Sequence, residues 1–88
     1  MLFMRRGDES MAMGNVSEAR LLYTRAAESG WAYAALALAM TYDAKELAKM
    51  AVLGGVQPNA GMAAKWYARA RELGSQEAAE KLRRLGQN

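Results

Sequence analysis

The stretch ARLLYTRAAESG, residues 19–30, decides the fold, because it returns as AAKWYARARELG at residues 63–74. In that register Ala, Tyr, Arg, Ala, Glu and Gly coincide, and further along Ala34, Ala35 and Leu38 fall on Ala78, Ala79 and Leu82. An Ala-rich chain matches itself in part by chance. The coincidence of aromatic, Arg, Glu and Gly positions in one register nevertheless indicates an internal repeat, which is typical of helical solenoids.

Both copies have the apolar spacing of a helix. Ala19, Leu22, Tyr23 and Ala26 follow the i, i+3, i+4, i+7 pattern that places side chains on one helical face, and the second copy repeats it with Ala63, Trp66, Tyr67 and Ala70. Small and large residues alternate along these stripes, which favours close antiparallel helix hairpins. Ile is absent and Val and Thr are scarce. We therefore predict an all-α fold.

Glycines and capping residues divide the chain into six expected helices. Gly14, Gly30 and Gly74 are placed to end helices, and the pairs Asn15/Glu18 and Asp43/Glu46 have the form of capping boxes. The expected segments are 2–13, 16–29, 31–42, 44–53, 59–73 and 75–86. We expect one domain over residues 1–88: unit one at 2–29, unit two at 31–73 with an inserted helix at 44–53, and a capping helix at 75–86.

The pattern of residues within these units resembles a known family. The first unit reads Phe3-x-x-Arg6-Gly7-x-x-Ser10, then Gly14-Asn15 and Ala19-x-x-x-Tyr23-x-x-Ala26. The second reads Ala34, Leu38-Ala39 and Tyr42, then Gly55-Val56 and Ala63-x-x-x-Tyr67-x-x-Ala70. This resembles the tetratricopeptide repeats and, within that clan, the Sel-one-like repeats. Arg6, Ser10 and the insertion after Tyr42 depart from the family pattern.

The resemblance implies a helical-hairpin solenoid of about two and a half repeats with one inserted short helix. It also implies a repeat core made of Phe3, Gly7, Ala19, Tyr23, Ala26, Leu38, Tyr42, Ala63, Trp66, Tyr67 and Ala70. Solenoids of this kind hold peptides on their concave face. By resemblance that face falls on Met1, Met4, Asp8, Met11, Tyr33, Leu36, Met40 and Asp43.

The expected concave face is rich in Met, whose flexible side chain adapts to varied apolar partners. Two other interpretations stay open. The Met residues can be ordinary core, or the inserted helix can cover the groove with Leu47, Met50 and Ala51 as its buried side. The last helix is expected to be a terminal cap, with Glu77–Lys81 and Glu80–Arg84 pairs facing water.

Composition argues against catalysis. The chain has no Cys and no His, which excludes disulfides, cysteine nucleophiles, histidine-based triads and ordinary zinc or haem sites. Asp8 and Glu9 diverge on a helix, Asp43 and Glu46 have a capping role, and Lys45 or Lys49 would need a lowered pKa. We expect no enzyme, no metal and no cofactor.

Charge and hydropathy restrict the partners. The net charge is only +3, and the basic residues of the last third are interleaved with Glu72, Glu77 and Glu80, so we expect no nucleic-acid binding. The longest apolar run, 31–40, is too short to cross a membrane. Without a secretion signal the chain is cytoplasmic by default, an expectation that lapses if it is a fragment.

The sequence thus predicts a non-catalytic protein-interaction module, a scaffold or adaptor that binds a protein or peptide through its concave face. The alternative is a structural or homo-oligomerisation segment of a larger repeat protein.

Overall fold

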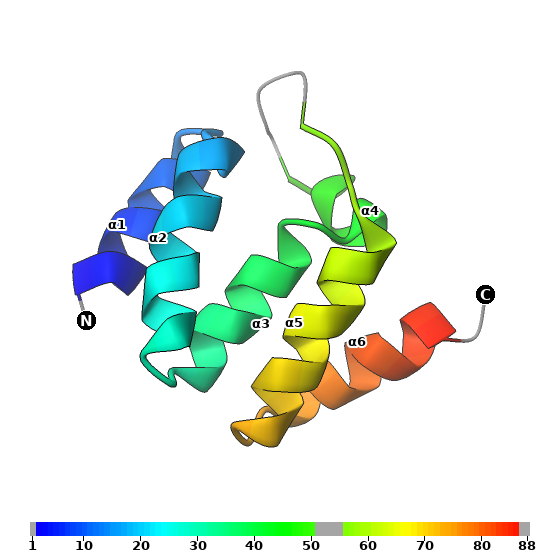
Figure 1. Ribbon diagram of the computed structural model, residues 1–88. Helices are drawn as coiled ribbons and strands as arrows, with labels where there is room; N and C mark the ends of the chain where they lie inside the picture. The colour runs from blue at the N-terminus through cyan, green and yellow to red at the C-terminus, as the bar shows by residue number, and fades with distance from the viewer. Residues whose placement is uncertain (1, 51–55, 87–88) are drawn as a thin grey trace.

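A computed structural model describes residues 2–50 and 56–86 of the chain. Within these ranges it contains helices and no strands, which confirms the all-α prediction. The helices are α1 (Leu2–Ala12), α2 (Val16–Glu28), α3 (Ala32–Met40), α4 (Ala44–Leu47), α5 (Ala60–Glu72) and α6 (Gln76–Gly86) (Figure 1). Among them none is both long and apolar enough to cross a lipid bilayer.

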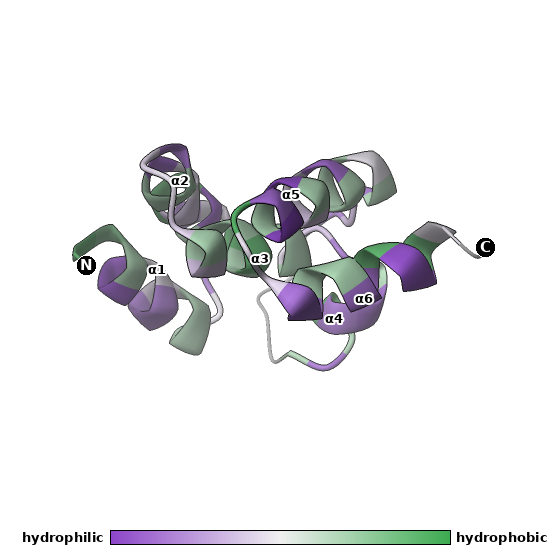
Figure 2. Ribbon diagram, turned by 90° about the horizontal axis from the view of Figure 1, so that it is seen from below, coloured by the Kyte–Doolittle hydropathy of each residue, from purple (hydrophilic) through white to green (hydrophobic). Residues whose placement is uncertain are grey.

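The long helices pack in chain order. Helix α1 contacts α2, α2 contacts α3, α3 contacts α5, and α5 contacts α6. Figure 2 shows the result as two rows, with α2 and α5 on one side and α1, α3 and α6 on the other. The chain therefore crosses back and forth between two layers of helices, and each layer exposes one face.

The helix ends follow the local signals in the sequence. Gly14, Gly30 and Gly74 have φ values of 79°, 92° and 110°, a left-handed conformation that side chains with a Cβ rarely adopt. The Asn15 side chain accepts a hydrogen bond from the Glu18 amide at 3.2 Å, so it caps α2. Asn59 and Ser75 accept from the amides of residues 62 and 78 and cap α5 and α6 in the same way.

The core lies between the two layers and consists mainly of alanines around two tyrosines, together with the larger side chains of Leu22, Leu36 and Leu38. Tyr23 and Tyr67 are buried at equivalent positions of the repeat. Gly7 lies against the Tyr23 ring so closely that an added Cβ would be 2.6 Å from Cε1. Of the residues that the family resemblance assigned to the repeat core, Gly7, Ala19, Tyr23, Ala26, Leu38, Ala63, Tyr67 and Ala70 are buried, and Phe3, Tyr42 and Trp66 are partly buried.

The inserted segment differs from its prediction. A helix was expected over 44–53, whereas α4 spans Ala44–Leu47 and residues 48–50 form a turn and bend. Its buried residue is Glu46, and Leu47 and Met50, expected on its buried side, are only partly buried. The remaining predictions for this segment, including Ala51, lie outside the described residues, as does Met1 of the predicted groove.

The two ends of the inserted segment meet. The Asn59 amide donates to the Tyr42 carbonyl at 2.8 Å, and Arg20 of α2 donates to the carbonyls of Thr41 at 2.6 Å and Gln57 at 2.9 Å. The Arg20 guanidinium also lies 4.0 Å from the centre of the Tyr42 ring. The chain therefore leaves α3 and returns to α5 at almost one point, and α3 packs on α5 as in an uninterrupted hairpin.

Candidate functional site

An open groove with a volume of about 400 Å³ lies between α1 and α3. Asp8, Met11 and Ala12 of α1 form one wall, and Tyr33, Ala37 and Met40 of α3 form the other. Each set has helical spacing, so each wall is a single helix face. Tyr23, Thr41 and Met50 complete the lining.

The structure brings together part of the predicted concave face. Asp8, Met11, Tyr33 and Met40 line the groove. Met4 and Leu36 do not, because they are only 8% and 5% exposed and belong to the hydrophobic core. Asp43 is 2% exposed and bonded to other helices. These three predicted residues are therefore not on the open surface of the groove: Met4 and Leu36 turn toward the core, and Asp43 lies at the start of α4 against α5 and α6.

One hydrogen bond in the groove involves Asp8. The Tyr23 hydroxyl donates to Asp8 Oδ1 at 2.6 Å. Burial, and then the hydrogen bond and negative charge of Asp8, raise the pKa of Tyr23 far above its usual value, so Tyr23 is a neutral donor. The rest of the lining is apolar apart from the Tyr33 and Thr41 hydroxyls, and it includes no Lys or Arg.

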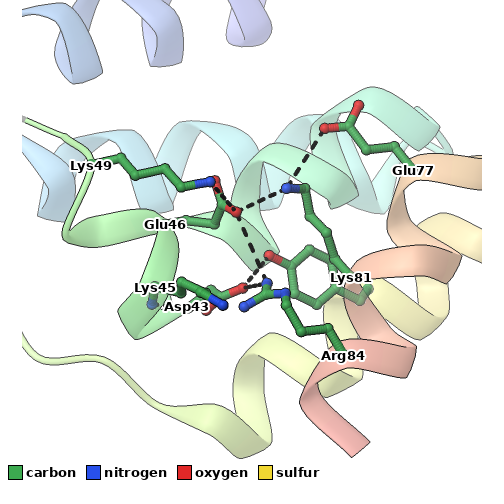
Figure 3. A network of polar contacts seen from close by, with 8 residues as sticks. Asp43, Lys45, Glu46, Lys49, Glu77, Lys81 and Arg84 are labelled. Atoms are coloured by element: carbon green, nitrogen blue, oxygen red, sulfur yellow. Dashed lines mark hydrogen bonds and ion pairs between the residues drawn. The ribbon is translucent and has the colours of Figure 1, made fainter. Parts of the chain in front are cut away.

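A second polar feature joins α4 to α5 and α6, and we call it the Asp43–Glu46 network (Figure 3). Asp43 Oδ2 accepts hydrogen bonds from the Tyr67 hydroxyl at 2.7 Å and from Arg84, while Oδ1 accepts from the Lys45 amide at 3.0 Å. Glu46 Oε2 is 2.8 Å from Lys81 Nζ. The network lies at the buried edge of α4 and anchors this short helix to the C-terminal helix.

Glu46 has further cationic neighbours. Its Oε2 is 3.4 Å from Lys49 Nζ and 3.9 Å from Arg84 Nη2, and Lys81 is also 3.9 Å from Glu77. Among the described residues no buried side-chain nitrogen or oxygen lacks a hydrogen-bond partner. The two buried carboxylates are therefore compensated by Lys49, just after α4, and by Lys81 and Arg84 of α6, as buried charges must be if they are not to destabilise the fold.

The network changes the acidity of its members. Burial by itself raises the pKa of Asp43, but hydrogen bonds from Tyr67, Arg84 and the Lys45 amide outweigh it and hold the pKa below its usual value. The pKa of Glu46 is likewise lowered, because bonds and charges from Lys81 and Lys49 outweigh its burial. Burial and the bond to Asp43 raise the pKa of Tyr67.

Sequence reasoning missed this network. It predicted a capping box for Asp43 and Glu46, yet Asp43 caps the Lys45 amide and Glu46 pairs with Lys81. It predicted that Arg84 pairs with Glu80, yet Arg84 reaches Asp43. The sequence did contain one indication of the network. Asp43 and Glu46 are three residues apart, and so are Lys81 and Arg84, which is the spacing that places two side chains on the same side of a helix.

The described part of the chain is thus an all-helical domain with a largely apolar groove open between α1 and α3. No protein-family model, curated protein or solved structure matches the chain.

Proposed function

We propose that this chain is a helical-hairpin solenoid of the tetratricopeptide or Sel-one-like kind and acts as a non-catalytic scaffold or adaptor. In this proposal it binds a peptide or protein through the groove between α1 and α3. The observation that carries the proposal is the groove itself, with its Met-rich walls and with Tyr33 at its side 62% exposed. Large apolar side chains gathered in an open groove are a common sign of an interaction surface.

The packing of the helices supports the solenoid part of the proposal. Helices follow one another between two layers, and Tyr23 and Tyr67 occupy matching buried positions in the two units. In each unit the tyrosine hydroxyl donates to a carboxylate, Asp8 or Asp43. Because the closed base of the inserted segment leaves α3 and α5 packed together, the insertion is compatible with a regular succession of hairpins.

The lining residues support a protein partner. Met11, Met40 and Met50 offer flexible, polarizable side chains that adapt to different apolar shapes. Tyr33 adds a rigid ring with a polar tip, the type of side chain that contributes strongly to interfaces. A groove of this volume accommodates one or two large side chains of a bound segment.

The basic residues favour a protein partner over nucleic acid. Lys81 and Arg84 are occupied by Glu46 and Asp43, and Arg69 is 3.3 Å from Glu72. A phosphate-binding surface needs cations that are free to contact phosphates along one face. The pairing of these three side chains reduces the number of cations in the last third of the chain that are free for that role.

Three alanine variants test the proposal. A random-peptide display library is selected on the immobilised chain, and the affinity of the enriched peptide is then measured by fluorescence anisotropy. Tyr33→Ala and Met40→Ala are expected to weaken binding at least about fivefold with little loss of stability. Tyr67→Ala, a buried control outside the groove, is expected to cost about 3 kcal/mol or more of unfolding free energy. Equal destabilisation by all three variants, or no enriched peptide, would contradict the proposal.

Exposed apolar residues elsewhere favour homo-oligomerisation as the second candidate. Leu2, Leu21 and Trp31 are large and exposed, and none of them lines the groove. Light scattering coupled to size-exclusion chromatography over a range of concentrations tests this second candidate. A dimer that Leu21→Lys dissociates supports this second function, and a monomer at all concentrations excludes it.

A further inference from the structure

The groove holds a carboxylate that pairs with no cation among the described residues. Asp8 is the sole carboxylate among the lining residues, and no Lys or Arg lines the groove with it. Its Oδ1 accepts the Tyr23 hydroxyl at 2.6 Å. In the part of the chain that the structure describes, Asp8 has neither an ion pair nor a second side-chain hydrogen bond, so Oδ2 remains able to accept from outside.

The other tyrosine–aspartate pair of the molecule shows how such a carboxylate is completed. The Tyr67 hydroxyl donates to Asp43 at 2.7 Å, almost the same distance as in the Tyr23–Asp8 pair. Asp43 also receives the Arg84 guanidinium from the neighbouring helix α6. The pair at Asp8 has the same tyrosine donor at the matching repeat position but lacks the cation.

The position of Asp8 is fixed well enough to select a ligand. Tyr23 is buried and packs against Gly7, so its hydroxyl cannot move far. The hydrogen bond from this hydroxyl holds the Asp8 carboxylate at the wall of the groove beside Met11. A preorganised carboxylate next to apolar side chains favours a cation that is attached to an apolar group.

We propose that the groove binds a peptide segment in which a Lys or Arg lies next to a large apolar residue. The cationic side chain pairs with Asp8, as Arg84 does with Asp43. The neighbouring apolar side chain packs against Met11, Tyr33 and Met40. This inference rests on the proposed function, because it specifies the partner of the same groove.

The test compares display selections on three forms of the full chain: the wild type, Asp8→Asn and Glu9→Gln. Asn keeps an oxygen that can accept the Tyr23 hydroxyl, so the groove wall is preserved while the charge is removed. Glu9→Gln removes one negative charge from an adjacent exposed residue that does not line the groove, which makes it the matched control. Circular dichroism verifies that all three forms fold.

We expect the wild type and Glu9→Gln to enrich peptides that have Lys or Arg beside Leu, Met or an aromatic residue. Asp8→Asn is expected to enrich apolar residues without the basic neighbour. For the best peptide, Asp8→Asn should weaken binding about fivefold or more, and replacing the basic residue of the peptide by Gln should abolish that difference. Added salt should reduce the wild-type affinity and leave that of Asp8→Asn nearly unchanged.

The outcomes separate the two proposals. Peptides that are enriched without any basic residue, or that bind Asp8→Asn and wild type equally, overturn the role of Asp8 and leave the groove as a binding site. Equal loss in Glu9→Gln and Asp8→Asn also overturns it, because the effect would then be one of overall charge. Failure to enrich any peptide on the wild type overturns the proposed function and this inference with it.

Discussion

Removing the Asp43 side chain should destabilise the protein far more than removing any exposed charge. Asp43→Ala leaves the buried Tyr67 hydroxyl without an acceptor, which costs about 1–3 kcal/mol. It also removes the ion pair with Arg84, whose side chain is 31% exposed and still lies 3.9 Å from Glu46, so the loss of that pair costs about 1 kcal/mol. We therefore expect the free energy of unfolding to fall by about 3 kcal/mol for Asp43→Ala.

The variant Asp43→Asn separates the contribution of the hydrogen-bond acceptor from that of the negative charge. Asn at position 43 can still accept from Tyr67 but has no charge for Arg84, so Asp43→Asn should cost about 1 kcal/mol. The double variant with Arg84→Gln should cost less than the sum of the two single variants, because both remove the same ion pair.

Urea unfolding followed by circular dichroism measures these losses at neutral pH. Asp8→Asn is the matched control, since Asp8 also accepts a tyrosine hydroxyl but is exposed and has no cation. It should change the unfolding free energy by less than about 0.5 kcal/mol. A loss for Asp43→Ala as small as that of the control would refute the role of the network. Equal losses for Asp43→Ala and Asp43→Asn would refute the division between acceptor and charge.

Three further predictions follow from the contacts described above. The free energy of unfolding should fall with acidification, because Asp43 and Glu46 have lower pKa values in the folded than in the unfolded protein. Their contribution to stability is present above about pH 4.5 and is lost as the pH falls toward the folded pKa values. Urea titrations at several pH values should show a smaller fall in stability when both residues are replaced by their amides. Gly7→Ala should destabilise by about 1 kcal/mol in thermal unfolding, since the clash with the Tyr23 ring exceeds the gain in helix propensity; a raised melting temperature would contradict this. Arg20→Met removes the hydrogen bonds to the Thr41 and Gln57 carbonyls and should cost about 2 kcal/mol in urea unfolding. Arg5→Met, an exposed control, should cost under about 0.5 kcal/mol. Equal losses would show that the contacts at the base of the insertion do not stabilise the fold.

The parts of the fold that depend on local sequence were predictable. Helix ends at Gly14, Gly30 and Gly74 come from backbone conformation, and the caps Asn15 and Asn59 act within three residues. The stripes around the two core tyrosines follow directly from helical periodicity. These features involve neighbours in sequence or a single period, and a single sequence contains that information.

Long-range polar contacts were not predictable in the same way. Arg84 has a local partner by spacing, Glu80, yet it contacts Asp43, since a buried carboxylate attracts a cation more strongly than an exposed one does. Arg20 gave no local sign that it would bond carbonyls at both ends of the insertion. The burial of Met4 and Leu36 depends on how α1 and α3 are rotated about their own axes relative to the core. Sequence periodicity determines that rotation only to within about one side-chain position.

The closed base of the inserted segment has a consequence for how this protein can change. Because the chain leaves at Tyr42 and returns at Asn59 through a direct hydrogen bond, the two ends of the insertion are held together as at the base of a loop. Lengthening such a loop costs only a slowly growing closure entropy, about 0.6 kcal/mol for each doubling of its length. Residues 48–50 and 56–58, beyond α4, are thus positions where new sequence can be added by evolution or by a protein engineer without altering the helices on either side.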